Sequence, residues 1–221
     1  MVKGAVFDMD GLMFDTEKLA CKGWLHAAKQ LNYPITEETV GKIRGTNVVT
    51  SKQIFKEEFG DAVSYDAARQ IRDAYVEQEI EEHGVPMKPG LIALLNYLKE
   101  CKVKMAVATS TNRISAEKYL KMASIYDYFD ELVFGDEVKN GKPAPDIFLM
   151  AVKKIALVPS ECVVFEDSPH GIRAAYRAGT KIIGVQDLTV FDAEVLNMLD
   201  YNCVTLEDAI PLLKELNRTF L

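Results

Sequence analysis

Acidic, hydroxyl and basic side chains recur at corresponding places in this chain, after short apolar segments. The set comprises Asp8 and Asp10, Thr109 and Ser110, Lys142, and Glu166 with Asp167. A carboxylate can attack phosphorus or bind a hard cation. Hydroxyls can donate hydrogen bonds to a phosphate, and a lysine can neutralise part of its charge. Because each member follows a predicted strand or its loop, the set predicts one site for phosphoryl chemistry.

Four of these side chains are carboxylates, so their charges would repel one another in a shared pocket. Such a cluster needs a cation or a shared proton. Hard oxygen ligands without neighbouring His or Cys favour Mg²⁺ over zinc or copper. We therefore expect a magnesium site with Asp8, Asp10, Glu166 and Asp167 as its ligands.

The carboxylates after the first apolar run differ in position, which suggests different roles. Asp8 stands directly at the strand end, where its position is best fixed, and is the candidate nucleophile. Asp10 lies two residues further on. It could protonate the leaving oxygen and then deprotonate the water that hydrolyses the intermediate.

The remaining polar residues suit the phosphate. Thr109 and Ser110 can donate hydrogen bonds to phosphate oxygens, and the helix expected from Asn112 adds its positive end. Lys142 can neutralise phosphate charge and restrain the nucleophile. Each motif alone also has a plain reading as a turn, a helix cap or a solvated loop. The shared order and spacing of the motifs favour the interpretation that they form one functional site.

The elements that must position these residues alternate between strands and helices. Expected strands span 4–7, 104–108, 132–134, 162–165 and 181–185, and a weak element lies at 203–204. Expected helices span 91–101, 113–122, 145–156 and 171–178, and a final helix begins at 206. Such alternation predicts an α/β fold with a doubly wound parallel sheet.

The segment between the first and second strands has another character. Residues 16–31 have helical periodicity, with Leu19, Trp24, Leu25, Ala28 and Leu31 as inward candidates. Residues from about 34 to 84 are rich in charge, lack a convincing strand and repeat apolar residues at helical spacing. We expect a helical cap domain at 16–85, inserted into a catalytic core formed by 1–15 and 86–221.

The net charge, the apolar segments and the cysteines limit the binding partners and the cellular location that we expect. The 221 residues carry a net charge of −7 and no Lys/Arg-rich run, which argues against nucleic acid. No apolar stretch approaches a membrane span, and Asp8 interrupts the first apolar run, so neither a membrane nor a signal peptide is expected. Four unpaired cysteines, expected to be reduced and mostly buried, fit the cytoplasm. We expect a monomer, although nothing in the sequence distinguishes it from a dimer.

At these motifs the sequence resembles the haloacid dehalogenase-like hydrolase superfamily, in the branch of phosphoglycolate phosphatase and β-phosphoglucomutase relatives. The resemblance covers essentially the whole chain. Four motifs carry it: FDMDGLMFDTE at 7–17, VATS at 107–110, GKPAPD at 141–146 and VFEDSPHG at 164–171.

The resemblance implies a Rossmann-like core with a helical cap inserted after the first strand. It implies Asp8 as nucleophile, Asp10 as general acid and base, and Thr109 and Lys142 as further catalytic residues. It also implies Mg²⁺ held by Asp8, the backbone carbonyl of Asp10 and Asp167, with Glu166 nearby or ligating. Ser110 and Gly11 are expected at the phosphate, and Arg44 and Gly45 of the cap at the substrate.

The expected activity is hydrolysis of a small phosphorylated metabolite, such as a sugar phosphate, through an aspartyl-phosphate. A sugar-phosphate mutase is the alternative, since it shares every core residue. The β-phosphoglucomutase-like pattern carries a His shortly after its Asp-Thr pair, where this sequence has Ala20, and this difference favours a phosphatase. A third possibility is a binding module that keeps the metal and the phosphometabolite without catalysis.

Overall fold

The computed structural model describes residues 2–44 and 48–218, with side chains up to residue 216. The chain divides into two compact units. One unit combines Met1–Asp15 with Met87–Leu221, and the other is Thr16–Pro86. We call them the core unit and the helical unit and treat each separately.

The core unit is built on a parallel sheet. In the described residues its strands are β1 (Gly4–Phe7), β2 (Lys104–Thr109), β3 (Glu131–Phe134), β4 (Cys162–Glu166), β5 (Lys181–Val185) and β6 (Tyr201–Cys203). Their order across the sheet is β3-β2-β1-β4-β5-β6, and every neighbouring pair is parallel. This is the order of a doubly wound sheet. The predicted α/β class is confirmed.

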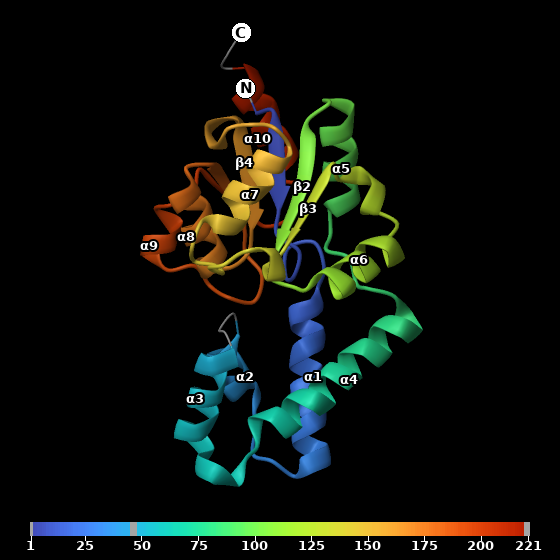
Figure 1. Ribbon diagram of the computed structural model, residues 1–221, viewed down its shortest axis with the longest axis vertical. Coiled ribbons are helices and arrows are strands. Elements are labelled where there is room, and N and C mark those ends of the chain that lie inside the picture. The colour runs from blue at the N-terminus through green and yellow to red at the C-terminus, as the bar shows by residue number, and fades with distance from the viewer. Residues whose placement is uncertain (1, 45–47, 219–221) are drawn as a thin grey trace. The chain divides into compact units, whose positions relative to one another are not determined.

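Helices cover both faces of this sheet (Figure 1). They are α5 (Leu91–Glu100), α6 (Arg113–Met122), α7 (Asp146–Lys154), α8 (Pro169–Ala178), α9 (Ala193–Leu196) and α10 (Ala209–Arg218). Short 3₁₀ turns lie at η2 (Tyr126–Tyr128), η3 (Gly135–Glu137) and η4 (Pro159–Glu161). The helices α7 and α8 lie on one side of the strands and α5 on the other. α9 was not predicted, because four residues are too few to show helical periodicity.

Burial explains why the strands are short apolar runs. All residues of β1 and β4 are buried, as expected for strands covered on both faces. Val6 and Val164 contribute to one apolar cluster with α7 and α8. On β1 and β4, the neighbouring Phe7 and Phe165 rings stack with centroids 4.7 Å apart. Asp8, which follows β1, and Glu166, which ends β4, are thereby fixed at the carboxyl ends of these two strands.

The helical unit packs around aromatic side chains. It contains α1 (Thr16–Leu31), α2 (Glu37–Ile43), α3 (Val48–Phe59), η1 (Gly60–Ala62) and α4 (Tyr65–His83). Trp24 lies 5.5 Å from the rings of both Phe55 and Tyr65, measured between centroids. The inward side of α1 differs slightly from the prediction: Ala27 is buried and Leu31 packs against the apolar cluster, whereas Leu25 is only partly buried and does not belong to that cluster. The reason is the close packing of α1 against α4, which favours small residues.

The cysteines are free thiols, but only two of the four are buried, so the prediction of mostly buried thiols was too broad. Cys21 is partly exposed and Cys101 is exposed. Burial raises the pKa of the Cys162 and Cys203 thiols to about 11, so these two are protonated at neutral pH. Among the helices of the described residues, none has the length and apolar character needed to cross a membrane.

A partly buried lysine, Lys88, links the segments of the core unit where the chain enters and leaves the helical unit. Lys88 Nζ lies 2.5 Å from Asp187 Oδ1 and 3.5 Å from Asp15 Oδ1. The backbone N–H of Lys88 also donates to the carbonyl of Met13, at 2.8 Å. Lys88 thus ties residues 13–15, the return segment and the loop after β5 together.

Replacing Lys88 with Met is expected to lower the free energy of unfolding by about 2 kcal/mol, since a charged hydrogen bond to a buried carboxylate is lost. Urea denaturation followed by circular dichroism measures this change. The matched control is Lys3→Met, which removes a more exposed pair with Glu161 and should cost less than about 1 kcal/mol. Equal losses in the two variants would show that Lys88 is not an anchor.

Candidate active site

The site lies where the strand order of the sheet reverses. β1 and β4 are neighbours, and their following connections run in opposite directions across the sheet, which opens a crevice at their carboxyl ends. Asp8 follows β1, Glu166 ends β4, and Asp167 comes next. The backbone N–H of Asp8 donates to the Phe165 carbonyl at 3.1 Å, so the ladder of the two strands extends to Asp8 and fixes its position.

Lys142 joins two of these carboxylates. Its Nζ donates to Asp8 Oδ1, and to Glu166 Oε1 at 2.7 Å. The three side chains are 8%, 10% and 0% exposed, respectively, so the ion pairs are shielded from water. Nζ also lies 4.8 Å from the centre of the Phe148 ring. The predicted proximity of Lys142 to Asp8 is present in the structure.

The buried cluster carries an excess of negative charge. Oxygens of Asp8, Glu166 and Asp167 all lie within 4.8 Å of one another. Three buried carboxylates and one buried ammonium leave a formal charge of −2, which a divalent cation would balance. All the side-chain donors are carboxylate oxygens, the ligands that hard cations prefer. The residues present therefore fit a divalent metal ion.

The titration behaviour of the cluster agrees with this charge count. Burial raises the pKa of Asp8 to about 7, with Lys142 opposing the change and Glu166 adding to it. Burial alone would lower the pKa of Lys142, but Asp8 and Glu166 outweigh it and raise that pKa. Lys142 is thus a fixed cation at neutral pH, whereas burial and the neighbouring Glu166 favour the protonated form of Asp8.

Glu166 accepts three hydrogen bonds through its two carboxylate oxygens. Its Oε1 accepts from Lys142, and its Oε2 accepts from the backbone N–H and the hydroxyl of Ser168 at 2.8 and 3.0 Å. Ser168 also caps α8, because its Oγ accepts from the Gly171 N–H. The Glu166 carboxylate is therefore held in one orientation, facing Lys142.

Asp10 is held by hydroxyls at the end of the neighbouring strand β2 and in the turn that follows it. Thr111 Oγ1 donates to Asp10 Oδ2 at 2.6 Å, and Thr109 Oγ1 reaches the same oxygen at 3.5 Å. The backbone N–H of Thr111 donates to Thr109 Oγ1 at 3.0 Å. Sequence reasoning selected Thr109 but missed Thr111. The run Thr109-Ser110-Thr111 offers three hydroxyls, and spacing alone does not show which one faces the carboxylate.

Two glycines allow backbone to approach the carboxylates. Gly11 has a φ of +84°, and a Cβ there would collide with the Asp167 carboxylate. A Cβ on Gly171, at the start of α8, would collide with the Glu166 carboxylate. Each glycine therefore leaves the space in which a carboxylate of the cluster sits.

Gly171→Ala is expected to displace the Glu166 carboxylate and to lower the free energy of unfolding by about 1–3 kcal/mol, the usual cost of overpacking a core. Thermal or urea unfolding measures it. Gly41→Ala is the control, because Gly41 also lies in a helix but has nothing within 4 Å of the added methyl group. The Gly41 change should be neutral or stabilising. A Gly171→Ala protein as stable as wild type would contradict the packing described here.

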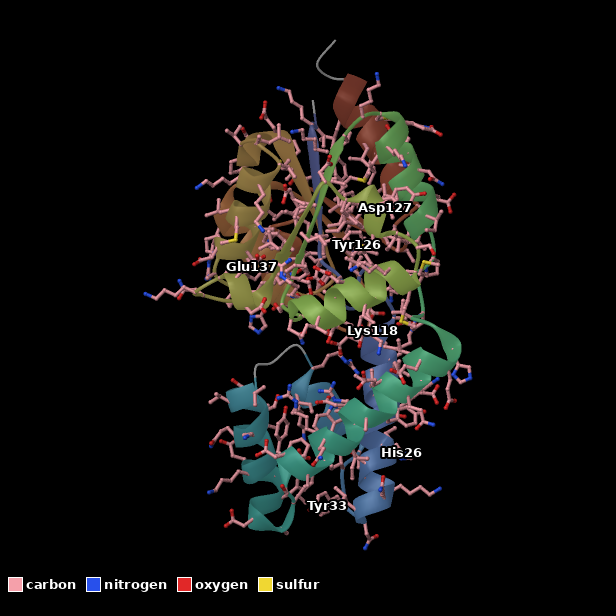
Figure 2. All side chains as sticks on the ribbon, turned by 45° about the vertical axis from the view of Figure 1, so that its right-hand side comes forward. His26, Tyr33, Lys118, Tyr126, Asp127 and Glu137 are labelled. Carbon is pink, nitrogen blue, oxygen red and sulfur yellow. The ribbon has the colours of Figure 1, made fainter. Side chains whose placement is uncertain are left out.

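Other residues singled out in the sequence lie elsewhere. Ser110 is exposed, one residue beyond β2. Arg44 belongs to the helical unit, where it ends α2, and Gly45 lies outside the described residues. In the helical unit, His26 lies on α1 (Figure 2), and its ring centroid is 4.9 Å from that of Tyr75.

The sequence of this chain is similar to that of a known protein family and of individual phosphatases. The profile of the family described as haloacid dehalogenase-like hydrolase matches residues 5–185. A phosphorylated carbohydrates phosphatase of Thermotoga maritima is 34% identical over 187 residues, covering 83% of this chain and 85% of its own. Hexitol phosphatase A of Escherichia coli is 32% identical over 205 residues, covering 93% and 92%.

A solved structure is similar over nearly the whole chain. It is a crystal structure of a candidate β-phosphoglucomutase from Thermotoga maritima, which is 32% identical with a TM-score of 0.80. The similarity covers 97% of this chain and 99% of that one. The fold of this chain is thus shared with a solved structure named as a candidate mutase, while the sequence relatives described above are named as phosphatases.

Proposed function

Because the chain belongs to the haloacid dehalogenase-like hydrolase family, we propose that it is a phosphatase of small phosphorylated metabolites, sugar phosphates among them, with Mg²⁺ as its cofactor. The observation that carries this proposal is the buried arrangement of Asp8, Lys142 and Asp167 at the reversal of the strand order. A nucleophilic carboxylate, a fixed ammonium and a cation-binding carboxylate together suit transfer of a phosphoryl group through an aspartyl-phosphate.

The proposed reaction has two steps. Asp8 Oδ attacks phosphorus, the bond from phosphorus to the leaving oxygen breaks, and Asp10 gives that oxygen a proton. Asp10 then takes a proton from a water molecule as that water attacks the phosphoaspartate, which releases inorganic phosphate and regenerates Asp8. The hydroxyls of Thr111 and Thr109 hold Asp10 for both transfers.

The cation would be held by Asp8, Asp167 and the backbone carbonyl of Asp10. When bound, Mg²⁺ offsets the negative charge that gathers on the phosphoryl oxygens. We place Glu166 beside this set as a positioning residue, because Lys142 and Ser168 already occupy its two oxygens. It remains close enough to belong to the same acidic cluster.

The other residues expected at the substrate are part of the same proposal. Ser110 and the N-terminal end of α6, which Asn112 caps, would donate to phosphate oxygens. Gly11 would let the backbone approach the phosphate beside Asp167. Residues 16–85 would act as the cap, with Arg44 and Gly45 contacting the rest of the substrate. We also propose a cytoplasmic monomer, a location with which the four free thiols agree.

A sugar-phosphate mutase is the second candidate, favoured by the similarity to the candidate β-phosphoglucomutase. The sequence has Ala20 on α1 where a mutase-like pattern carries His. Alanine has no group that could carry a proton, so a mutase would need a different acid or base in the helical unit. This argument supports a phosphatase.

One experiment separates the candidates. The protein is incubated with Mg²⁺ and a panel of sugar phosphates, nucleotides and phosphoglycolate, and phosphate release is measured. β-Glucose 1-phosphate with a bisphosphate primer is assayed in parallel for glucose 6-phosphate. Release of phosphate supports the proposal, formation of glucose 6-phosphate supports the mutase, and the absence of both across the panel would support a binding module.

A further inference from the structure

A short turn of the core unit lies against the residues that face the phosphate in the proposed function. It is η3 (Gly135–Glu137), which directly follows the edge strand β3. Thr109, the last residue of β2, pairs with Phe134, the last residue of β3, so the segments that follow the two strands start side by side. The segment after β2 comprises residues 110–112 and leads into α6, and we call it the β2–α6 turn.

Gly135 touches the backbone of the β2–α6 turn. A Cβ on Gly135 would lie 2.4 Å from the carbonyl oxygen of Ser110 and 2.9 Å from its carbonyl carbon. Atoms that are not bonded do not approach so closely, so a larger residue at position 135 would have to move Ser110. The backbone N–H of Gly135 also donates to the Thr111 carbonyl, at 3.4 Å. The glycine therefore allows one backbone segment to fix the other.

Glu137 fixes the start of α6 (Figure 2). Its Oε1 accepts from Nη2 of Arg113, the first residue of α6, at 2.7 Å. The Arg113 guanidinium also lies 4.4 Å from the centre of the Phe134 ring, which restrains its orientation. Glu137 Oε2 accepts from the backbone N–H of Phe134 at 3.1 Å. One carboxylate thus connects the end of β3 to the first residue of α6.

Glu137 is ionised at neutral pH. Burial opposes its ionisation, but the Phe134 N–H, Lys154 and Arg113 outweigh burial and lower the pKa of Glu137. Lys154 Nζ lies 3.4 Å from Glu137 Oε2 and also donates to the carbonyl of Leu132 on β3, at 3.0 Å. The carboxylate that holds Arg113 is therefore itself held by β3 and α7.

We propose that Gly135 and Glu137 are positioning residues that hold the β2–α6 turn in the conformation that binds the phosphoryl group. The inference rests on the proposed function, in which Ser110 and the N-terminal end of α6 donate to phosphate oxygens. Such donors hold an anion only when they converge on it, and a misplacement of about 1 Å can cost about 10²-fold in rate. The same turn carries Thr111, whose hydroxyl donates to Asp10, so its position matters for both parts of the site.

Gly135→Ala tests the backbone contact, and Glu137→Gln tests the charged one. Inorganic phosphate is titrated into each folded protein in the presence of Mg²⁺, and its Kd is measured by isothermal titration calorimetry. Gly135→Ala should raise Kd about tenfold, because its methyl group displaces Ser110. Glu137→Gln should raise Kd about threefold, since glutamine can still accept from the Phe134 N–H but lacks the charge that holds Arg113.

Glu161→Gln is the matched control for Glu137→Gln. Glu161 also ends a 3₁₀ turn, η4, where it accepts from the backbone N–H of Val158 and pairs with Lys3. A merely structural role would lower the stability of both glutamine variants alike and leave the Kd of the folded proteins unchanged. Gly41→Ala is the control for Gly135→Ala, because nothing lies within 4 Å of its added methyl group.

Weaker phosphate binding in Gly135→Ala and Glu137→Gln, with unchanged Kd in both controls, supports the proposal. If Gly135→Ala does not fold, Glu137→Gln decides alone. The proposal is overturned if the wild type binds no phosphate, or if either folded variant binds phosphate as tightly as the wild type. The titration needs no turnover, so a protein that binds phosphate but hydrolyses no phosphomonoester would refute the proposed phosphatase and still test the two positioning residues.

Discussion

Asp8→Asn is expected to reduce kcat for phosphomonoester hydrolysis by about 10³-fold or more, the scale on which loss of a nucleophile acts. The amide has nearly the same shape as the carboxylate but is a very weak nucleophile. It also removes one of three buried negative charges, so the repulsion in the cluster falls. The variant should therefore fold while losing its activity.

The loss of kcat is measured as phosphate release in the presence of Mg²⁺. Folding of the variant is checked by circular dichroism and urea unfolding. The control is Asp127→Asn on η2, an exposed acid of the core unit (Figure 2). It should retain wild-type turnover. Activity of Asp8→Asn within about tenfold of the wild type, in protein shown to be free of deamidation, would exclude Asp8 as the attacking group.

Lys142→Met is expected to lower the free energy of unfolding by about 3–5 kcal/mol, because it leaves Asp8 and Glu166 buried without their shared cation. The Met side chain has similar length and can occupy the space beside Phe148. The cost is electrostatic, so another cation should offset part of it. Added Mg²⁺ is expected to stabilise the variant more than the wild type.

Urea unfolding with and without Mg²⁺ gives the free energy of unfolding of each variant and its increase when Mg²⁺ is added. Lys139→Met is the matched control, an exposed lysine on the same loop whose loss should change stability by less than about 0.5 kcal/mol. If Lys142→Met costs no more than Lys139→Met, the buried ion pairs do not stabilise the protein. If Mg²⁺ stabilises the variant less than the wild type, the charge account of the cluster is wrong.

The fold could be predicted because the central strands are short runs of mainly apolar residues that end abruptly in polar ones. β1 ends before Asp8 and β4 ends at Glu166, so the sequence marks both strand ends directly. The α9 helix and the exact inward face of α1 could not be predicted in this way. They depend on neighbours in space, such as the close packing of α1 against α4.

The candidate active site could also be predicted only in part from the sequence. The motifs predicted which side chains gather at the sheet edge, but not which partner each one takes. Thr111, rather than Thr109, makes the short bond to Asp10, and Glu166 directs its oxygens to Lys142 and Ser168.

The most direct test is to look for the phosphoryl group on Asp8. Wild-type protein is mixed with Mg²⁺ and a ³²P-labelled substrate, quenched in acid within milliseconds to seconds, digested and analysed by mass spectrometry. The account predicts a transient phosphoryl group on the peptide that contains Asp8, formed and lost at least as fast as turnover and absent in Asp8→Asn. Full turnover with no label on that peptide at any time would contradict it.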